Sequence, residues 1–348
     1  MKLKKNHNLS LDKFINLSLY SKKFGYYMKK DSFGEKGDFI TSPNISRLFS
    51  EMIGVWIISF WNSLGSPKKF NLIELGAGNG EMMKILIESF RNFPTFLSSC
   101  NFIIIEKSPT LIKIQKKKLK GDNVKWIDSI NSLKKKPSIF VANEFFDAIP
   151  IKQFIKLNRN WFEIYVGKKN DNKPFFFNKK IDMKKFEKKI KFEISYNQNF
   201  IEYSKVGLDY LEKISKFIKK NKGGILIIDY GYFENQMKDT IQSVSKQKYS
   251  NILENIGNCD ITHNINFKLF KKIIKKIGGL KDEITTQKEF LIKLGIKQRA
   301  EIISKNLPFS KKTSIFFRLK RLIDNKQMGN HFKVMLIKNK NNKFKLGF

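Results

Sequence analysis

The stretch that most constrains the fold is NLIELGAGNGEMMKIL, residues 71–86. Its apolar run ends at Glu74, glycines follow at Gly76, Gly78 and Gly80, and helix-forming residues come next. Glycines in such a loop permit a tight turn and let backbone amides approach a ligand at the N-terminus of the next helix. The stretch therefore predicts a strand, a glycine loop and a helix that together bind a nucleotide.

From residue 70 onward, strands and helices alternate. Short continuous apolar runs such as FIIIE and SIFVAN are typical of parallel strands that are buried on both faces. The elements expected here are strands at 70–75, 101–106, 124–127 and 138–142 and helices at 81–91 and 109–119. Further along the chain, GGILIIDYG and FKVMLIKN indicate two more strands. Two more helices are expected at 204–220 and 267–277, and weaker elements follow the second of them. This pattern predicts an α/β protein with a Rossmann-like, doubly wound sheet.

Two segments depart from the alternation. Residues 1–66 predict helices joined by a turn-rich loop. Residues 151–200 contain KQFIKLNRNWFEIYVG and KPFFFN, which alternate as antiparallel strands do, with KKNDN suited to a hairpin turn between them. We therefore expect an N-terminal helical cap and lid at 1–66, a core at 67–155 and 223–348, and an inserted antiparallel and helical segment at 156–222.

The composition indicates a globular protein and constrains the cellular compartment in which it is found. Hydrophobic residues make up 41% and charged residues 28% of the 348 residues, which is a globular composition. The two cysteines, Cys100 and Cys259, form no CxxC motif and no disulfide framework, which favours a reducing compartment. The most apolar run, VWIISFW at 55–61, is far shorter than the roughly 18 residues of a membrane span. We expect no membrane span, and the basic N-terminus without a signal core favours a bacterial cytoplasm.

The formal net charge of +37 raises the question of nucleic-acid binding. Only six of the 68 basic residues are arginine, and the lysines are scattered along the chain. Interfaces that recognise nucleic acids favour arginine forks and aromatic platforms. We therefore expect a solvated lysine-rich surface, without specific nucleic-acid binding but with salt-sensitive adhesion to polyanions.

The glycine loop favours S-adenosylmethionine over a dinucleotide. A dinucleotide fingerprint is GxGxxG, whereas this loop is GxGxG from Gly76 and has Glu81 at the sixth position. A carboxylate there repels a pyrophosphate but suits a cofactor with a sulfonium, an ammonium and no phosphate. Glu74 is placed to support that cationic end beside the three glycines, and Glu106 ends the next strand, where a carboxylate accepts both ribose hydroxyls. Asp128 follows the VKWI strand and is placed to accept from the adenine amino group.

The acceptor is expected beside NEFFDAIP, which follows the fourth strand. Asn143 is placed to contact the cofactor. Glu144 and Asp147 are three residues apart, share a face in a helical turn, and as paired carboxylates would hold a guanidinium. As alternatives, Asp147 could cap a turn and Glu144 could form an ion pair with a lysine. Asp229, in the predicted strand GGILIIDYG, could either line the site or have a structural role. We take Glu144 and Asp147 as the candidate catalytic residues.

The segment GDFITSP is a candidate lid over the cofactor site. Gly37 and the turn at Thr41 and Ser42 would close over the cofactor, or would form a packed N-terminal loop. The three histidines are isolated and no spacing of His, Cys or Asp suggests a metal site.

Motifs along nearly the whole chain resemble the MidA family of class I S-adenosylmethionine-dependent methyltransferases, whose mitochondrial members are assembly factors of respiratory complex I. The matching motifs, in the family's order, are FGYYMKKDSFGEKGDFITSPNISRLFSEMIGVW, IELGAGNG, IIEKSP, NEFFDAIP, GGILIIDYG, TTQKEFLIKLGI and QMGNHFKVMLI. The resemblance implies a protein-arginine methyltransferase that closes its N-terminal segment over S-adenosylmethionine. It also implies a complex I subunit near the quinone-binding arm as protein substrate, and the mitochondrial matrix as the location of eukaryotic relatives.

Two alternatives stay open. One is a methyltransferase that acts on RNA or a small molecule, although NEFFDAIP lacks the Asn/Asp-Pro-Pro-aromatic box of enzymes that methylate amino groups of nucleic acids. The other is a non-catalytic assembly chaperone, although the intact glycines and Glu106 argue for a retained cofactor site. The sequence leaves open the target arginine, mono- or dimethylation, and whether the chain forms a homodimer.

Overall fold

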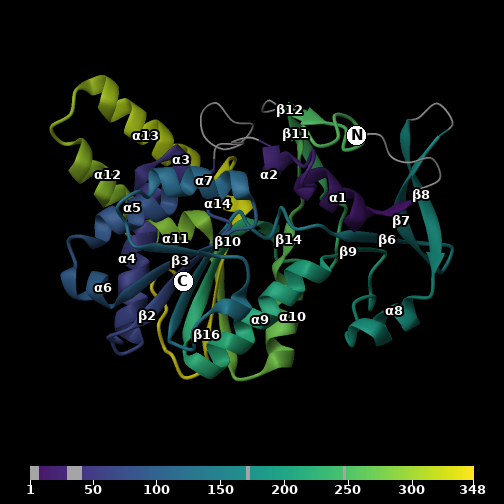
Figure 1. Ribbon diagram of the computed structural model, residues 1–348, viewed down its shortest axis with the longest axis horizontal. Helices are drawn as coiled ribbons and strands as arrows, with labels where there is room; N and C mark the ends of the chain where they lie inside the picture. Colours follow the sequence, from purple (N-terminus) through teal and green to yellow (C-terminus); the bar gives the residue numbers. More distant parts are fainter. Residues whose placement is uncertain (1–7, 30–40, 170–172, 246–247) are drawn as a thin grey trace.

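The computed structural model describes residues 8–29, 41–169, 173–245 and 248–348. Its centre is a mostly parallel sheet with strand order β15-β16-β10-β5-β2-β3-β4 (Figure 1). These strands are β2 Phe70–Leu75, β3 Cys100–Ile105, β4 Val124–Ile127, β5 Ser138–Asn143, β10 Gly223–Tyr232, β15 Leu280–Thr286 and β16 Phe332–Asn339. β16 runs antiparallel to both of its neighbours, and the short β14 (Ile265–Asn266) pairs with β10. The predicted doubly wound α/β sheet is confirmed.

Helices cover both faces of this sheet. Along β5, Ile139 and Val141 pack into one hydrophobic core while Phe140 and Ala142 pack into the other, so the strand has no polar face. The first core is closed by α4 Arg47–Ser63, α5 Glu81–Phe90, α6 Pro94–Ser99, α11 Gln287–Lys293, α12 Ile296–Ser304 and α13 Phe309–Ile323. The second is closed by η1 Ile130–Ser132, α9 Lys205–Asn221 and α10 Phe267–Ile277. α7 (Pro109–Lys118) connects β3 with β4, and α14 (Met328–His331) precedes β16.

A second, antiparallel sheet stands beside the first (Figure 1). Its strands are β1 Leu9–Ser10, β6 Lys152–Leu157, β7 Asn160–Lys168, β8 Pro174–Ile181 and β9 Phe200–Tyr203, and α8 Met183–Ile190 follows β8. The expected antiparallel strands are confirmed, and KQFIKLNRNWFEIYVG forms two of them, because Asn158 and Arg159 turn the chain with φ of 46° and 65° between β6 and β7. The expected KKNDN turn includes residues 170–172, which lie outside the described residues.

The N-terminal segment forms helices that lie over the carboxyl edge of the main sheet. They are α1 Leu11–Tyr20, α2 Tyr26–Lys29 and α3 Ser42–Ile45. α1 packs with part of a small three-stranded sheet, β11 Gln242–Ser245, β12 Lys248–Ser250 and β13 Asp260–Thr262. Gly37 of the expected lid lies outside the described residues. No helix in the described part of the chain is both long and apolar enough to cross a bilayer.

Candidate functional site

The glycine loop between β2 and α5 has the conformation that its sequence predicts. Gly76, Gly78 and Gly80 have φ of 61°, 52° and 80°, which side chains rarely adopt. A Cβ on Gly76 would lie 2.8 Å from Cδ2 of Phe145. The loop therefore passes so close to the segment after β5 that only glycine fits at this position.

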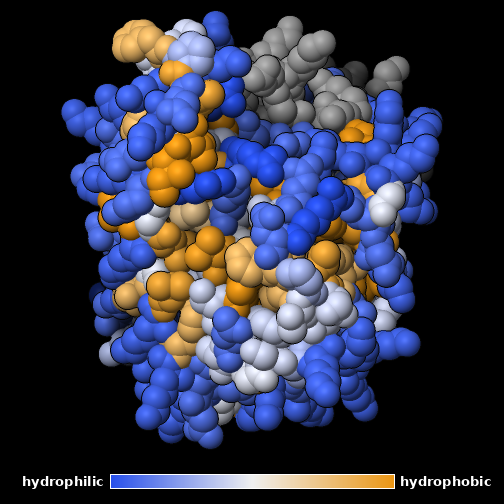
Figure 2. Space-filling view, turned by 90° about the vertical axis from the view of Figure 1, so that its left-hand side faces the viewer, coloured by the Kyte–Doolittle hydropathy of each residue, from blue (hydrophilic) through white to orange (hydrophobic). Residues whose placement is uncertain are grey.

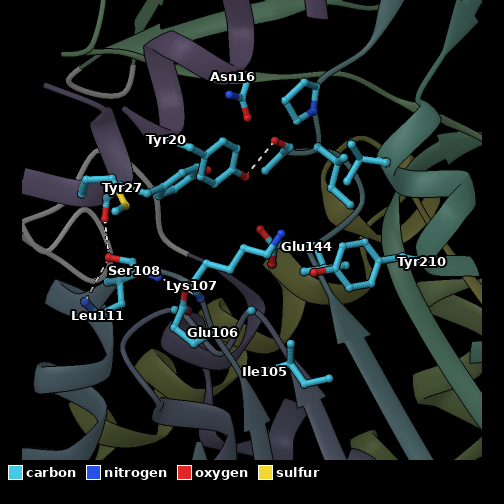
Figure 3. A pocket seen from close by; sticks show the side chains of 18 of the residues that line it. Asn16, Tyr20, Tyr27, Ile105, Glu106, Lys107, Ser108, Leu111, Glu144 and Tyr210 are labelled. Carbon is cyan, nitrogen blue, oxygen red and sulfur yellow. Dashed lines mark hydrogen bonds between the residues drawn. The ribbon is translucent and has the colours of Figure 1, made fainter. Parts of the chain in front are cut away.

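A cavity of about 390 Å³ lies between this loop, the ends of β3 and β5, and the N-terminal helices. Figure 3 shows Tyr20 and Tyr27 on the side of the helices, Glu106 and Ser108 opposite them, and Glu144 beside Tyr210. Its volume is that of an ordinary small-molecule pocket with a few polar groups in an apolar lining. The residues that line it are Asn16, Tyr20, Lys22, Tyr27, Met28, Gly76, Gly78, Ile105, Glu106, Lys107, Ser108, Leu111, Glu144, Phe145, Ala148, Ile149, Pro150, Val206 and Tyr210.

Glu106 is held at the end of β3 by three donors. Its Oε1 accepts from the backbone N–H groups of Lys107 and Ser108 at 2.8 and 2.9 Å, and its Oε2 accepts from Nε2 of Gln115 at 3.2 Å. Gln115 is fully buried on α7, donates also to the carbonyl of Gly78, and accepts from Nε1 of Trp126. One side chain thus ties the glycine loop, the end of β3 and β4 together. No sequence motif marks Gln115, because its partners come from three separate elements.

A smaller cavity of about 40 Å³ lies on the other side of the glycine loop. It shares Gly76, Gly78 and Glu144 with the larger cavity, and Thr41, Glu74 and Asn143 also line it. Within the described residues, Oε2 of Glu74 and Oδ1 of Asn143 are buried without a hydrogen-bond partner. Burial and the nearby Glu106 raise the pKa of Glu74 to about 8. Buried acceptors of this kind are stabilised by a bound cation or donor.

Glu144 stands on a strained turn at the end of β5. Its φ of 50° is uncommon for a residue with a side chain, and its Oε1 accepts from the Ser42 backbone N–H at 3.0 Å and from Nδ2 of Asn143 at 3.1 Å. Burial raises the pKa of Glu144 to about 7, against these donors and the charge of Arg321. Near neutral pH this carboxyl group can therefore either hold or release a proton.

Asp147 and Asp229 extend the acidic character of the same edge. Asp229, at the end of β10, is fully buried and accepts from the backbone N–H groups of Phe146, Asp147 and Tyr230 at 2.9, 3.3 and 2.9 Å. It therefore holds the segment after β5 in place, which is the structural role that the sequence left open. Oδ1 of the buried Asp147 has no hydrogen-bond partner among the described residues. Burial and the charges of Asp229 and Glu144 raise its pKa well above the usual range.

Hydrogen bonds from hydroxyl groups hold the N-terminal helices against the carboxyl edge of the main sheet. Tyr20 donates to the carbonyl of Ala148 at 3.0 Å, and Tyr27 donates to the carboxylate of Asp260 at 2.8 Å. Ser108, which caps α7, donates in turn to the carbonyl of Tyr27 at 2.7 Å (Figure 3). The helices therefore form one wall of the larger cavity.

Sequence comparison now identifies the family. A family described as S-adenosyl-L-methionine-dependent methyltransferases matches residues 52–285. The chain belongs to this family. The expected enzyme class, cofactor and MidA resemblance are thereby confirmed. In the part of this methyltransferase that the structure describes, no cluster of three or more His, Cys, Asp or Glu residues could hold a metal ion.

Curated relatives and solved structures agree with this assignment. The chain is 28% identical to "Protein arginine methyltransferase NDUFAF7, mitochondrial" of Xenopus tropicalis, over 95% of this chain and 83% of the relative. It is 26% identical to the human protein of the same name, over 95% and 80%. The fold is similar to that of a Burkholderia thailandensis protein crystallised with S-adenosyl-homocysteine, with a TM-score of 0.83, 19% identity, and coverage of 98% of this chain and 90% of that one.

The methyltransferase brings most of the predicted site residues together. Gly76, Gly78 and Glu106 line the larger cavity, Thr41, Glu74 and Asn143 the smaller one, and Glu144 both. Gly80 caps α5, Ser42 donates to Glu144, and Asp147 is buried in the same segment. Asp128 is the exception, because it is exposed after β4 and lines neither cavity.

Proposed function

We propose that this methyltransferase modifies arginine side chains of a protein substrate. The observation that carries the proposal is the cluster of three carboxyl groups at the carboxyl edge of the sheet, of which Asp147 and Asp229 are buried and Glu144 is partly buried and lines both cavities. Burial is the main cause of the raised pKa of each group, and within the described residues none of the three forms a salt bridge. A guanidinium supplies a permanent positive charge and several donors in one plane, which fits such a site better than a neutral acceptor does.

The chain's own residues suit the cofactor of the family. S-adenosylmethionine, when bound, supplies a methyl group activated by a sulfonium. Gly76 and Gly78 leave room at the loop, the carboxylate of Glu106 would accept from ribose hydroxyls, and the unpartnered oxygens of Glu74 and Asn143 would receive the ammonium group. We assign no contact to Asp128, which the structure leaves exposed.

Glu144 and Asp147 would act by orientation and proton transfer. Paired carboxylates fix which guanidinium nitrogen faces the methyl group, and closure of the cavity excludes water. The guanidinium is fully protonated before reaction, so the attacking nitrogen must lose a proton as its new bond forms. The carboxyl group of Glu144, with a pKa of about 7, can accept that proton. Asp229 would position the segment through its three backbone hydrogen bonds.

The proposal also covers the protein substrate of the enzyme and its location in the cell. The curated relatives are named protein arginine methyltransferases and mitochondrial. Together with the MidA resemblance, this supports a subunit of respiratory complex I as the protein substrate. For this chain we propose a bacterial cytoplasm as its location.

Label transfer tests the proposal. Purified enzyme and S-adenosylmethionine with a labelled methyl group are added to membranes and extract from cells that lack the gene. We expect label in methylarginine of one protein, strongly reduced by Glu144→Gln and Asp147→Asn. Glu212→Gln on the exposed surface of α9, where Glu212 pairs with Lys216, serves as the matched control and should keep full activity.

Other outcomes separate the alternatives. Label in RNA or in a small molecule would replace the protein substrate. Cofactor binding without any transfer would favour a non-catalytic chaperone.

A further inference from the structure

α13 lies beside the acceptor end of the site. It packs against α11, α12, α14 and α3, and α3 carries Ser42, whose backbone N–H donates to Glu144. Figure 1 shows α13 and α3 at the same edge of the molecule as the N-terminal helices. The positive charge of Arg321 on α13 acts on both Glu144 and Tyr230. Because α3 links α13 to Glu144, a protein bound along α13 would lie on the same side of the molecule as the candidate acceptor position.

A groove of about 530 Å³ follows the C-terminal half of α13. Phe316, Leu319 and Ile323 form an apolar floor, and the first and last of these are only partly buried. Its rim carries three lysines and one acid, which are Lys288, Lys320, Lys326 and Asp324, beside Asn325. The carboxylate of Asp324 accepts from the Lys326 backbone N–H at 2.8 Å, so it stabilises the rim itself. The groove thus joins an apolar floor to a net positive rim.

Outside the groove, α12 and α13 also expose large apolar side chains. Ile302, Phe309 and Phe317 on α12 and α13 are 67%, 85% and 71% exposed. Figure 2, which faces α12 and α13, shows hydrophobic patches within a mostly hydrophilic surface. Exposed apolar patches bordered by charge are typical of protein-binding surfaces.

The positive charge of the rim indicates which kind of molecule can bind in this groove. A second copy of the chain also carries a formal charge of +37 and would be repelled by the lysine rim. A nucleic acid would match the rim but not the floor, in which Leu319 and Ile323 are aliphatic and the one ring, Phe316, is partly buried. We propose that the groove docks an acidic segment with apolar side chains that belongs to the protein substrate and lies apart from its target arginine. This inference rests on the proposed arginine methyltransferase function.

Two synthetic peptides test the docking. One is a short arginine peptide, and the other joins the same peptide through a flexible Gly-Ser linker to an acidic segment that contains leucine and phenylalanine. We expect KM for the joined peptide to be lower by about tenfold, with kcat unchanged, because docking raises the local concentration of the arginine. Lys320→Glu combined with Lys326→Glu should remove this advantage and leave the kinetics with the short peptide unchanged. Lys184→Glu combined with Lys185→Glu on the exposed α8 is the matched control and should keep the advantage.

Binding of the acidic segment alone, measured by fluorescence anisotropy, separates docking from catalysis. We expect the wild-type protein to bind it and the Lys320→Glu, Lys326→Glu variant to bind at least about tenfold more weakly. Equal binding by both proteins, or equal competition by single-stranded RNA of the same charge, overturns the docking proposal. If the protein binds the acidic segment but methylates neither peptide, the docking proposal is supported and the proposed arginine methyltransferase function is contradicted.

Discussion

Glu74 ends β2 with its carboxyl group buried and Oε2 without a hydrogen-bond partner among the described residues. Its pKa is raised from 4.5 to about 8, so between these pH values the folded state holds a proton that the unfolded chain has released. The stability of the cofactor-free protein is therefore greatest below pH 4.5 as far as this group is concerned, and falls as the pH rises toward 8. Each unit of difference corresponds to about 1.4 kcal/mol.

Glu74→Gln should remove this pH dependence. We expect the variant, without cofactor, to be more stable than the wild type at pH 8 and to bind S-adenosylmethionine more weakly, because the neutral amide cannot balance a cation. Urea unfolding from pH 5 to pH 8 and calorimetric titration of the cofactor measure the two effects. A variant that loses stability at pH 8 would contradict this account of Glu74.

Gly76→Ala should disrupt the loop in two ways. The backbone has a φ of 61°, and the new Cβ would meet the Phe145 ring at 2.8 Å. The strained backbone alone costs about 1 to 3 kcal/mol, and the displaced ring should weaken cofactor binding at least tenfold. Gly121→Ala is the control, since Gly121 has a φ of 92° but a Cβ added there would meet no atom within 4 Å. It should lose stability but keep cofactor affinity, as measured by thermal shift with and without S-adenosylmethionine.

Some site residues were predictable because their role depends on position in a strand–loop–helix unit. The glycines and Glu106 follow directly from where β2 and β3 end. Gln115 and Asp229 were not assigned, because each acts through partners that are spread over several elements and distant in sequence. Asp128 also ends a strand, yet its side chain is exposed, so position alone did not determine its surroundings.

At the scale of elements, the N-terminal helices depend on a few buried hydroxyl groups. Tyr27→Phe removes the hydroxyl that donates to the buried carboxylate of Asp260. The loss should cost about 1 to 3 kcal/mol and loosen α1 and α2 while the main sheet stays folded. Limited proteolysis should then cleave the N-terminal segment faster, and KM for the cofactor should rise. Tyr196→Phe, at a side chain that is 68% exposed, should change neither.

The accuracy of the predicted elements follows their burial. β2 and β16 were predicted at 70–75 and 332–339 to the residue, because a strand buried on both faces leaves a continuous apolar run. β4 also lies at the predicted 124–127, although only Val124 of that strand is buried. β15 and the helices α11 to α14 were predicted only as weaker elements. β15 is only partly buried along most of its length and includes charged residues, so its pattern is not distinctive. The turn between β6 and β7 was missed because it uses Arg159 in a left-handed conformation.

At the scale of the whole molecule, the net charge of +37 should make stability depend on salt. Lysines repel one another over the surface, and salt shortens the range of that repulsion to about 10 Å at 0.1 M. We expect Tm to rise between 10 and 200 mM sodium chloride, and retention on a heparin column to fall over the same range. Calorimetric scans at several salt concentrations measure the first effect. A falling Tm would mean that ion pairs such as Arg299 with Glu51 outweigh the repulsion.

The position of β16 has a consequence for biosynthesis. β16 is the last strand of the main sheet along the chain, yet it lies between β10 and β15 and pairs with both. During translation those two strands have no partner on their facing edges until residues 332–339 leave the ribosome. A chain cut short anywhere before this strand leaves the apolar β10 as an open sheet edge and β15 without a neighbour, and open edges of this kind promote aggregation and chaperone binding. Residues 332–339 therefore decide whether the main sheet can close around β10.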